Sequence, residues 1–417
     1  MAELVPIEQA QNIILDAVGT IAPENIALEH ALGRTLAGDC VSDIDIAPFD
    51  NSAMDGFAFR AADLSQASEE SPVKLEIVAY IPAGAYYENE LQAGQCARIM
   101  TGAAVPAGAD TVEMIERVIL TGDGMVGDEL ILDHLVEQGK NVRYAGEEAK
   151  AGALVLQAGT TLDPAALGLL ASTGNVEVSV YRKPVVGIIS LGTELVEANE
   201  IPGPGQIRNS NRFALIGCIE RAGGIARAYP IAPDNYDAIK DTLSQAANEC
   251  DFVVSSGGAA DGDFDFITQI AGELGEVFFK YVNMRPGKAQ TFAVINKTPF
   301  LGLAGNPAAA ICGFEMLVYP ALQKMQGRST VFHPMQRAIV GSRATKKDSR
   351  VHFQRSSLAR NEEGKLVVSP YSNQSSALFS TFAESDCLLI VPGDVKVLEV
   401  GEEADIINFG IDSGMLI

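Results

Sequence analysis

The sequence has 417 residues, of which 47% are hydrophobic and 20% are charged. At roughly 150 residues per domain, this length predicts about two to four domains, and the apolar content excludes a disordered chain. The 54 acidic and 30 basic residues give a formal net charge of −24. Because such a chain repels phosphates and anionic lipids, nucleic acids and membranes are poor candidate partners.

The N-terminal residues, MAELVPIEQA, show no basic segment followed by an apolar run, and no stretch of about 20 apolar residues follows. We therefore expect a soluble, cytoplasmic protein. The six cysteines are scattered without a CxxC pair, and the four histidines are equally dispersed. This spacing favours buried, reduced thiols over disulfides or a zinc site, and it predicts that any metal is held by oxygen.

The first half of the chain divides into a helical and a β-rich part. Apolar residues recur at helical spacing from Ile7 to Val18, and a second helix is predicted from Pro23 to about Leu36, so residues 1–45 are expected to be helical. Over residues 46–144, short apolar runs alternate with Gly and Pro turns, which predicts β structure. The strands expected there are Val73–Ile81, Gln95–Met100, Thr111–Ile119 and Glu129–Leu132.

Residues 145–183 are expected to contain a capped helix and a strand. Asp163 is placed to cap a helix over Pro164–Ser172, with a proline at its first position, and Val176–Tyr181 has the pattern of a strand. The proline that follows Lys183 is interpreted as a domain boundary.

Residues 184–328 repeat the order strand, glycine turn, helix. The strands expected there are Val185–Ser190, Ala226–Ile231, Phe252–Ser255 and Phe300–Leu303. The helices are Asn209–Ala222, Tyr236–Glu249, Phe266–Leu274 and Pro307–Met325. Continuously apolar strands separated by helices are typical of a parallel sheet covered on both faces. This segment is therefore predicted to be a doubly wound α/β domain.

Residues 329–417 return to short alternating segments. The expected strands are Gln336–Val340, Arg350–Leu358, Lys365–Pro370 and Cys387–Val391. They predict a small C-terminal β-barrel or sandwich.

Polar residues follow the predicted strands of the α/β domain, where an open parallel sheet binds its ligand. Gly257, Gly258 and Gly305 can leave backbone N–H groups facing an anion, and Asn306-Pro307 can begin a helix whose dipole favours negative charge. Taken alone, GNP is more typical of an ordinary capped helix. Polar residues at four strand ends together favour a phosphate-bearing ligand.

Carboxylates at the same strand ends are candidate metal ligands. They are Glu194, Asp234, Asp261, Asp263 and Asp265. Oxygen ligands beside phosphates are typical of Mg²⁺, and Asp265 and then Asp234 are the favoured candidates, while Asx turns are the alternative for the aspartates of this loop. The turn Arg285-Pro286-Gly287-Lys288 places two cations together, either at the ligand or as an ordinary surface turn.

A second unusual region lies in the β-rich segment. FDNSAMDG (Phe49–Gly56) and RIMTG (Arg98–Gly102) carry more polar groups than turns need, so they can face a ligand or a partner. Composition alone does not decide between these two.

Six segments in order along the chain carry a family resemblance. They are FDNSAMDGFAFR (Phe49–Arg60), RIMTGAAVPAGADTVEM (Arg98–Met114), SSGG…DFD (Ser255–Asp265), RPGK (Arg285–Lys288), GLAGNP (Gly302–Pro307) and VHFQR (Val351–Arg355). The sequence resembles the molybdopterin molybdenumtransferase family, which includes MoeA and the E domain of gephyrin. The resemblance implies a four-domain homodimer that uses Mg²⁺ to insert molybdate into adenylylated molybdopterin and releases AMP. It also implies a helical linker domain built from residues 1–45 and 145–183.

The resemblance assigns roles to individual residues. As catalytic positions it implies Asp55, Thr101, Glu194, Asp234 and Lys288, with Asp265 and Asp234 as magnesium ligands. For the nucleotide phosphates it implies Ser256, Gly257, Gly258, Gly305, Asn306 and Pro307, and for molybdate Arg285, Lys288, Arg350 and Ser376. The motifs DNSAMDG and RIMTG of one subunit would face the crevice of the other. Candidate partners are the molybdopterin adenylyltransferase and proteins of molybdoenzyme maturation.

Four motifs depart from the family pattern. The usual KPGKP, LPGNPVS, TGDEL and GGVSVGE read RPGKA, LAGNPAA, LGTEL and GGAADGD here. Arg285 keeps the charge of lysine but not its geometry, and Ala289 and Ala309 remove a proline and a hydroxyl from a small oxyanion pocket. Two alternatives to an active transferase therefore stay open: a non-catalytic paralogue that binds pterin or nucleotide as a dimeric scaffold, and a nucleotide pyrophosphatase-like hydrolase.

Overall fold

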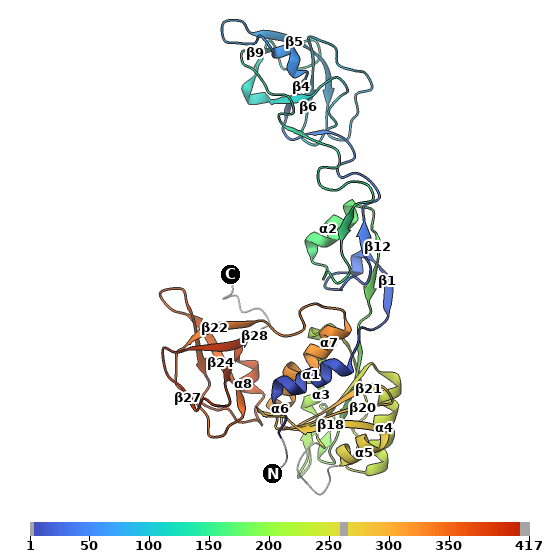
Figure 1. Cartoon of the computed structure of the whole chain (residues 1–417), viewed down its shortest axis with the longest axis vertical. Helices are drawn as coiled ribbons and strands as arrows, with labels where there is room; N and C mark the ends of the chain where they lie inside the picture. The colour runs from blue at the N-terminus through green and yellow to red at the C-terminus, as the bar shows by residue number, and fades with distance from the viewer. Residues whose placement is uncertain (1–3, 259–265, 409–417) are drawn as a thin grey trace. The chain divides into compact units, whose positions relative to one another are not determined.

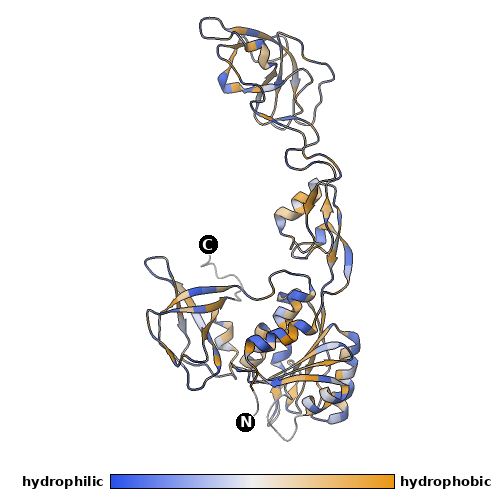
Figure 2. Ribbon diagram, viewed as in Figure 1, coloured by the Kyte–Doolittle hydropathy of each residue, from blue (hydrophilic) through white to orange (hydrophobic). Residues whose placement is uncertain are grey.

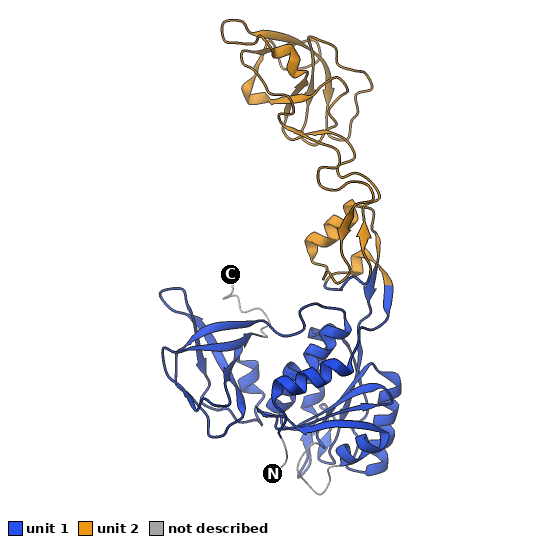
Figure 3. Ribbon diagram, viewed as in Figure 1, with its two compact units in different colours: residues 1–24, 33–37, 179–417 blue, residues 25–32, 38–178 orange. Residues whose placement is uncertain are grey.

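The computed structural model describes residues 4–258 and 266–408, whose elements are drawn in Figure 1. The chain forms two compact units (Figure 3). Unit 1 comprises Met1–Glu24, Gly33–Ala37 and Ser179–Ile417, and unit 2 comprises Asn25–Leu32 and Gly38–Val178. The two are described separately below.

Unit 1 contains a six-stranded sheet whose four central strands are mostly buried and apolar (Figure 2). Its order is β16 (Ile225–Ala228), β13 (Val185–Ser190), β17 (Phe252–Ser256), β21 (Thr298–Leu303), β20 (Ala289–Ile295) and β18 (Gly275–Tyr281). The first four strands are parallel, as predicted, but β20 and β18 are antiparallel. The sheet is therefore mixed, and the expectation of a purely parallel sheet is wrong at this edge.

Helices cover both faces of this sheet. The helices of unit 1 outside the barrel are α1 (Ile7–Ala17), α3 (Ser210–Arg221), α4 (Tyr236–Glu249), α5 (Phe266–Leu274), α6 (Pro307–Gly313) and α7 (Tyr319–Met325), the last two joined by a π-helical turn over Phe314–Val318. Along β17, Phe252 and Val254 pack with α1, α3, α6 and α7, whereas Val253 packs with α4 and α5. This alternation confirms the doubly covered α/β architecture.

The C-terminal part of unit 1 is a closed β-barrel. Its strands pair in the order β24 (Val351–Arg360), β25 (Leu366–Pro370), β22 (Met335–Val340), β28 (Glu403–Asn408) and β26 (Cys387–Val391), and β26 pairs back with β24. Accessory elements are β19 (Met284–Arg285), β23 (Ala344–Thr345), β27 (Val397–Leu398) and α8 (Ser380–Ala383), and β14 (Leu195–Val196) pairs with β15 (Ile207–Arg208). Closure confirms the barrel alternative and removes exposed strand edges.

Unit 2 is built around a second six-stranded sheet. Its order is β7 (Thr111–Met114), β4 (Gly56–Phe59), β6 (Gln95–Ile99), β5 (Val73–Ile81), β9 (Glu129–Leu132) and β8 (Ile119–Leu120). The other elements are α2 (Pro164–Ser172), β3 (Asn51–Ser52) paired with β10 (Val142–Arg143), and β2 (Cys40–Val41) paired with β11 (Leu154–Leu156). Asp163 caps α2 as predicted, its carboxylate accepting from the Ala166 N–H at 2.8 Å.

Two predictions for the N-terminal half need correction. The helix expected from Pro23 to Leu36 is instead β1 (Pro23–Ala27), followed by a short 3₁₀ turn over Leu28–His30, and β1 pairs with β12 (Glu177–Tyr181). The strand expected over Thr111–Ile119 ends at Met114. Residues 1–45 are therefore helical only over α1, which packs into the core of unit 1. The bounds of the five predicted segments themselves stay predictions.

Two general expectations concern the cysteines and membrane spans. All six cysteines are free and buried, which confirms the expectation of buried thiols. Among the helices of the described residues, none is both long enough and apolar enough to cross a bilayer.

Candidate functional site

A cleft of about 680 Å³ in unit 1 collects most of the residues predicted from the sequence. It is lined by Gly257, Gly258, Arg285, Pro286, Gly287, Lys288, Ala289, Ala304, Gly305, Asn306, Ala309, Arg350, Gln374, Ser375 and Ser376. These residues come from the ends of β17 and β21, the turn before β20, and two loops of the barrel. Both predicted glycine turns and all four predicted molybdate residues therefore meet at one cleft.

One wall of the cleft consists of tight glycine turns after β17 and β21. Gly257 has a φ of +94°, and a Cβ there would lie 2.5 Å from the Leu191 carbonyl oxygen. Gly305 packs against Gly257, since a Cβ on Gly305 would lie 3.4 Å from the Gly257 Cα. The Asn211 side chain connects the two turns by donating to the Ser256 hydroxyl at 2.7 Å and to the Gly305 carbonyl at 2.8 Å.

The start of α6 differs from the simple expectation of an anion-binding helix end. Asn306 occupies the N-cap position and Pro307 the first helical position, as predicted, although among the described residues the Asn306 side chain makes no capping hydrogen bond. The backbone N–H of Ala308 donates to the Ser376 carbonyl at 2.9 Å. One of the first helical donors thus holds the barrel loop against α6. The backbone N–H of Gly257 donates to the Leu303 carbonyl at 3.2 Å, so the prediction of a free N–H at this glycine is wrong, and Gly258 and Gly305 are the glycines predicted to face an anion.

A second group of lining residues carries the cations and forms the part of the cleft that is called the cationic wall below. Arg285 belongs to β19, which pairs with β24 so that Arg285 lies beside His352. Gly287 has a φ of +94° and lets the turn bring Lys288 to the cleft, where its Nζ lies 4.7 Å from the Tyr281 ring centroid. Arg350 lines the same wall.

Asp348 holds the two arginines together. Its Oδ2 accepts from Arg285 Nη1 at 2.9 Å and from Arg350 Nη2 at 2.7 Å, while its Oδ1 accepts from Arg350 Nε at 3.2 Å and lies 2.9 Å from His352 Nε2. Burial raises the pKa of Asp348, but the hydrogen bonds from Arg350, His352 and Arg285 outweigh it, so this pKa lies well below its usual range. The carboxylate is therefore charged and pairs the two guanidinium groups.

Glu194 and Asp234 lie at the adjacent strand ends. Leu191 and Ala232 form a parallel bridge, and beyond it the Thr193 N–H and hydroxyl donate to Asp234 Oδ2 at 3.1 and 3.0 Å. Glu194 lines a small hollow of about 90 Å³ together with Ser256, Gly257, Gly305 and Pro307. The hollow shares Gly257 and Gly305 with the main cleft, which places these predicted residues at one edge of the sheet.

Three predicted aspartates cannot be placed. Asp261, Asp263 and Asp265, including the favoured magnesium ligand, lie outside the described residues. Within the described residues, no group of three or more His, Cys, Asp or Glu side chains could hold a metal ion. The magnesium site therefore stays a prediction.

The motifs DNSAMDG and RIMTG meet within unit 2. Asp55 Oδ1 accepts from both the backbone N–H and the hydroxyl of Thr101, each at 2.7 Å. These bonds lower the pKa of Asp55. The two predicted residues are therefore neighbours, with an ionised carboxylate exposed at the surface of the unit.

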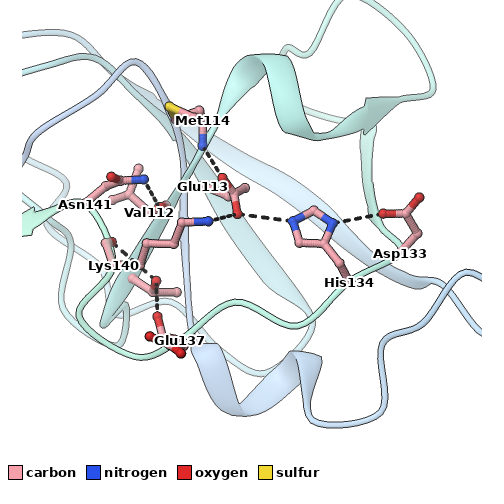
Figure 4. Close-up of polar contacts among 9 residues, drawn as sticks. Val112, Glu113, Met114, Asp133, His134, Glu137, Lys140 and Asn141 are labelled. Atoms are coloured by element: carbon pink, nitrogen blue, oxygen red, sulfur yellow. Dashed lines mark hydrogen bonds and ion pairs between the residues drawn. The ribbon is translucent and has the colours of Figure 1, made fainter.

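Sequence reasoning missed a buried charged cluster beside these motifs. The Glu113 side chain is 0% exposed, and its carboxylate accepts from Lys140 Nζ at 2.7 Å and from the Met114 N–H at 3.0 Å. Figure 4 shows that Lys140 and His134 both point at this carboxylate; His134 Nε2 lies 3.2 Å from it, and the other ring nitrogen faces Asp133. Lys140 precedes β10, which pairs with Asn51–Ser52 of the first motif. The cluster therefore anchors the segment that supports DNSAMDG.

Comparison with known families covers nearly the whole chain. The MoeA N-terminal region (domain I and II) matches residues 5–174, a probable molybdopterin binding domain matches residues 187–324, and the MoeA C-terminal region (domain IV) matches residues 337–409. A molybdopterin molybdenumtransferase of Bacillus subtilis is 35% identical over 98% of this chain and 95% of its own length. The chain belongs to the molybdopterin molybdenumtransferase family. Membership gives it a role in molybdenum cofactor biosynthesis.

Two further relatives agree with this assignment. The molybdopterin molybdenumtransferase of Haemophilus influenzae is 34% identical over 97% of this chain and 99% of its own length. The crystal structure of a molybdopterin biosynthesis MoeA protein from Pyrococcus horikoshii matches 98% of this chain and 100% of its own with a TM-score of 0.83 at 31% identity. The multidomain fold predicted from the sequence is therefore confirmed.

Proposed function

We propose that the chain inserts molybdate into adenylylated molybdopterin and releases AMP. The observation that supports this reaction is the division of the cleft into two walls of different chemistry. Glycine turns with Gly257 and Gly258 form one wall, and Arg285, Lys288 and Arg350 with Ser376 line the other. A phosphate suits the backbone N–H groups predicted to face the cleft at Gly258 and Gly305, and a small oxyanion suits a cluster of cations and a hydroxyl.

The reaction then depends mainly on positioning. The cationic wall would hold molybdate, and the glycine turns would hold the phosphate that leaves with AMP, so that the two reacting parts lie side by side. Because Asp348 already pairs Arg285 with Arg350, their geometry is fixed before the ligand arrives, which lowers the reorganisation that binding requires. The chain itself supplies charge neutralisation and orientation.

Magnesium is part of the proposal, and the carboxylates of this edge have the donor chemistry that it needs. Asp234 and Glu194 both present oxygen ligands at neighbouring strand ends, and Mg²⁺ commonly binds one or two carboxylates together with phosphate oxygens and water. When bound, the ion would neutralise charge on the phosphates. Asp234, Glu194 and Asp265 are the residues proposed to hold it.

We also propose that the active form is a cytoplasmic homodimer. Asp55 and Thr101 form an ordered, exposed pair in unit 2 that no ligand role within that unit explains. In the proposed dimer, this pair of one subunit completes the cleft of the other. Adenylyltransferase and molybdoenzyme maturation proteins remain the proposed partners.

Release of AMP tests the proposed reaction. Purified protein, adenylylated molybdopterin, Mg²⁺ and molybdate should yield AMP at a rate that depends on both inorganic ions. Lys288→Ala should slow this release by about a hundredfold, since it removes a cation from the binding wall. Lys280→Ala is the matched control, because Lys280 is an exposed lysine of β18 that does not line the cleft.

Two results would contradict the proposal. Absence of AMP release from the wild-type protein, with intact binding of AMP, would favour the non-catalytic paralogue. Hydrolysis of free nucleotide diphosphates without molybdate would instead favour the pyrophosphatase-like alternative.

A further inference from the structure

Arg355 is a buried guanidinium group behind one wall of the cleft. It lies in the middle of β24, its side chain is 0% exposed, and it is among the largest fully buried side chains of the chain. Its Nη2 donates to the Ser375 carbonyl at 3.0 Å. Within the described residues, its Nε and Nη1 have no hydrogen-bond partner, and no carboxylate forms an ion pair with it.

The surroundings of Arg355 are apolar. The Phe382 ring lies with its centroid 5.5 Å from Arg355 Cζ, and the fully buried Cys312 of α6 is close enough to interact with its charge. Burial lowers the pKa of this guanidinium group. A cation without a counter-ion in such a place is costly, because no carboxylate among the described neighbours compensates its charge.

Arg355 also supports three residues that line the cleft. Its backbone N–H donates to Gln374 Oε1 at 3.0 Å, and Gln374 Nε2 donates back to the Arg355 carbonyl at 2.8 Å. Its side chain holds the Ser375 carbonyl, and Ser376 is held by the Ala308 N–H of α6. The segment 374–376 therefore rests on Arg355 from one side and on α6 from the other.

The two arginines that line the cleft are in the opposite electrostatic situation. Arg285 and Arg350 share Asp348, so part of their charge is already compensated in the free protein. Arg355 has no such compensation within the described residues. Its guanidinium group contacts the carbonyl of Ser375, the residue before Ser376, in a region where burial weakens dielectric screening.

We infer that Arg355 is a positioning residue for the oxyanion: its uncompensated buried charge and its hold on the segment 374–376 together set the affinity of the cleft for a tetrahedral dianion at Ser376. This inference rests on the proposed function. A dianion on the far side of the wall supplies the negative charge that the free protein lacks there. The buried cation lowers the free energy of unfolding of the free protein, and binding of the anion offsets this loss.

Three variants of the full-length protein test this inference. Arg355→Met removes the charge and keeps the length of the side chain, Arg355→Lys keeps the charge, and Arg360→Met changes an exposed arginine at the end of the same strand as a matched control. Binding of molybdate and, separately, of AMP is measured by calorimetry for each variant. Thermal unfolding of the ligand-free proteins is followed alongside.

The inference predicts a selective effect. Arg355→Met should weaken molybdate binding by about tenfold or more, whereas Arg355→Lys should stay within about threefold of the wild type. AMP affinity should change by less than about threefold in all three variants, because the glycine turns are untouched. The midpoint of thermal unfolding should not fall in Arg355→Met, because a costly buried charge is removed and the Ser375 carbonyl keeps the Leu378 N–H as a donor.

Other outcomes would overturn it. Wild-type molybdate affinity in Arg355→Met, or an equal loss of molybdate and AMP binding, would show that Arg355 serves only the packing of the barrel. If Arg355→Met does not fold, Arg355→Gln replaces it, and equal molybdate affinity in the Gln and Lys variants would reject the role of charge. Failure of the wild-type protein to bind molybdate would contradict the proposed function instead.

Discussion

Glu113 in unit 2 and Arg355 in unit 1 are both charged side chains with 0% exposure, yet their surroundings differ. Glu113 receives hydrogen bonds from Lys140 and the Met114 N–H and lies within 3.2 Å of His134. Arg355 has one described hydrogen bond from its side chain, to a backbone carbonyl. The first charge is fully compensated inside the protein, and the second is not.

This difference distinguishes a buried charge that serves the fold from a buried charge that can interact with a ligand. A buried charge with all its partners stabilises the fold, and removing it costs stability. A buried charge left without partners beside a cleft costs stability in the free protein and is retained for another reason. The comparison therefore predicts opposite consequences for neutralising the two residues.

The largest expected effect is at Glu113. Glu113→Gln should destabilise unit 2 by about 3 kcal/mol, because Lys140 and His134 lose a charged acceptor that water only partly replaces. Hydrogen–deuterium exchange on peptides covering β4 and β7 measures this local change. Glu116→Gln, at an exposed position two residues after β7, should leave the exchange unchanged. Equal exchange rates in Glu113→Gln and Glu116→Gln would show that the buried carboxylate does not stabilise unit 2. The distinction between Glu113 and Arg355 would then be wrong.

The pH dependence of unit 2 should follow from the same carboxylate. Burial raises the pKa of Glu113, but the hydrogen bonds from Lys140, His134 and the Met114 N–H outweigh it, and the net shift is downward. A depressed folded-state pKa stabilises the fold above the unfolded value of about 4.3 and loses this contribution as the pH falls further. The opening free energy obtained from exchange, after correction for the intrinsic exchange rate at each pH, should therefore fall less steeply toward acid pH in Glu113→Gln than in the wild type. Equal steepness would contradict this assignment.

A smaller effect is expected at the glycine turns of the cleft, and it tests the geometry of the site in unit 1. Gly257→Ala should weaken AMP binding by about thirtyfold, because φ is +94° and the new Cβ meets the Leu191 carbonyl. Gly305→Ala is the matched change, since its nearest neighbour would lie at 3.4 Å and its φ is outside the left-handed region. Calorimetric AMP titration should show only a few-fold loss for Gly305→Ala. Equal losses would argue against the fixed geometry of this turn.

The smallest effect is expected at Asp348. Asp348→Asn should weaken molybdate binding by about fivefold, because Arg285 and Arg350 lose the charged acceptor that pairs them. Its effect should be smaller than that of Arg355→Met, since removal of the carboxylate also removes a negative charge near the oxyanion. Tighter molybdate binding in Asp348→Asn would show that Asp348 competes with the ligand rather than preparing its site.

Helices and strands with strong local sequence signals were predicted correctly. The bounds of α2, α4, β5, β9 and β13 match the predictions, because a proline or a capping asparagine marks each helix start and turn residues bound each of these short, largely apolar strands. The antiparallel strands β18 and β20 were missed although a signal existed: Asn296 and Lys297, both with positive φ, form the two-residue turn between β20 and β21. At Pro23–Ala27, pairing with β12 overrides an apparent helical spacing.

Apart from Arg350 and Ser376, which the family resemblance supplied, the residues of the cleft could be predicted only where they are close in sequence. The turn RPGK and the glycines after β17 and β21 were found because each is a local motif at a strand end. The roles of Asp348, Gln374 and Arg355 depend on the pairing of β19 with β24 and on the packing of a barrel loop against α6. No local spacing reveals such contacts, since they join segments far apart in the chain.

A crystal structure of the protein soaked with molybdate, AMP and Mg²⁺ tests the central claim most directly. The account predicts molybdate within hydrogen-bond distance of Arg285, Arg350 or Ser376, and the AMP phosphate against the Gly257–Gly258 turn in the same cleft. Molybdate bound elsewhere on the protein, or the phosphate and molybdate in separate pockets, would contradict it.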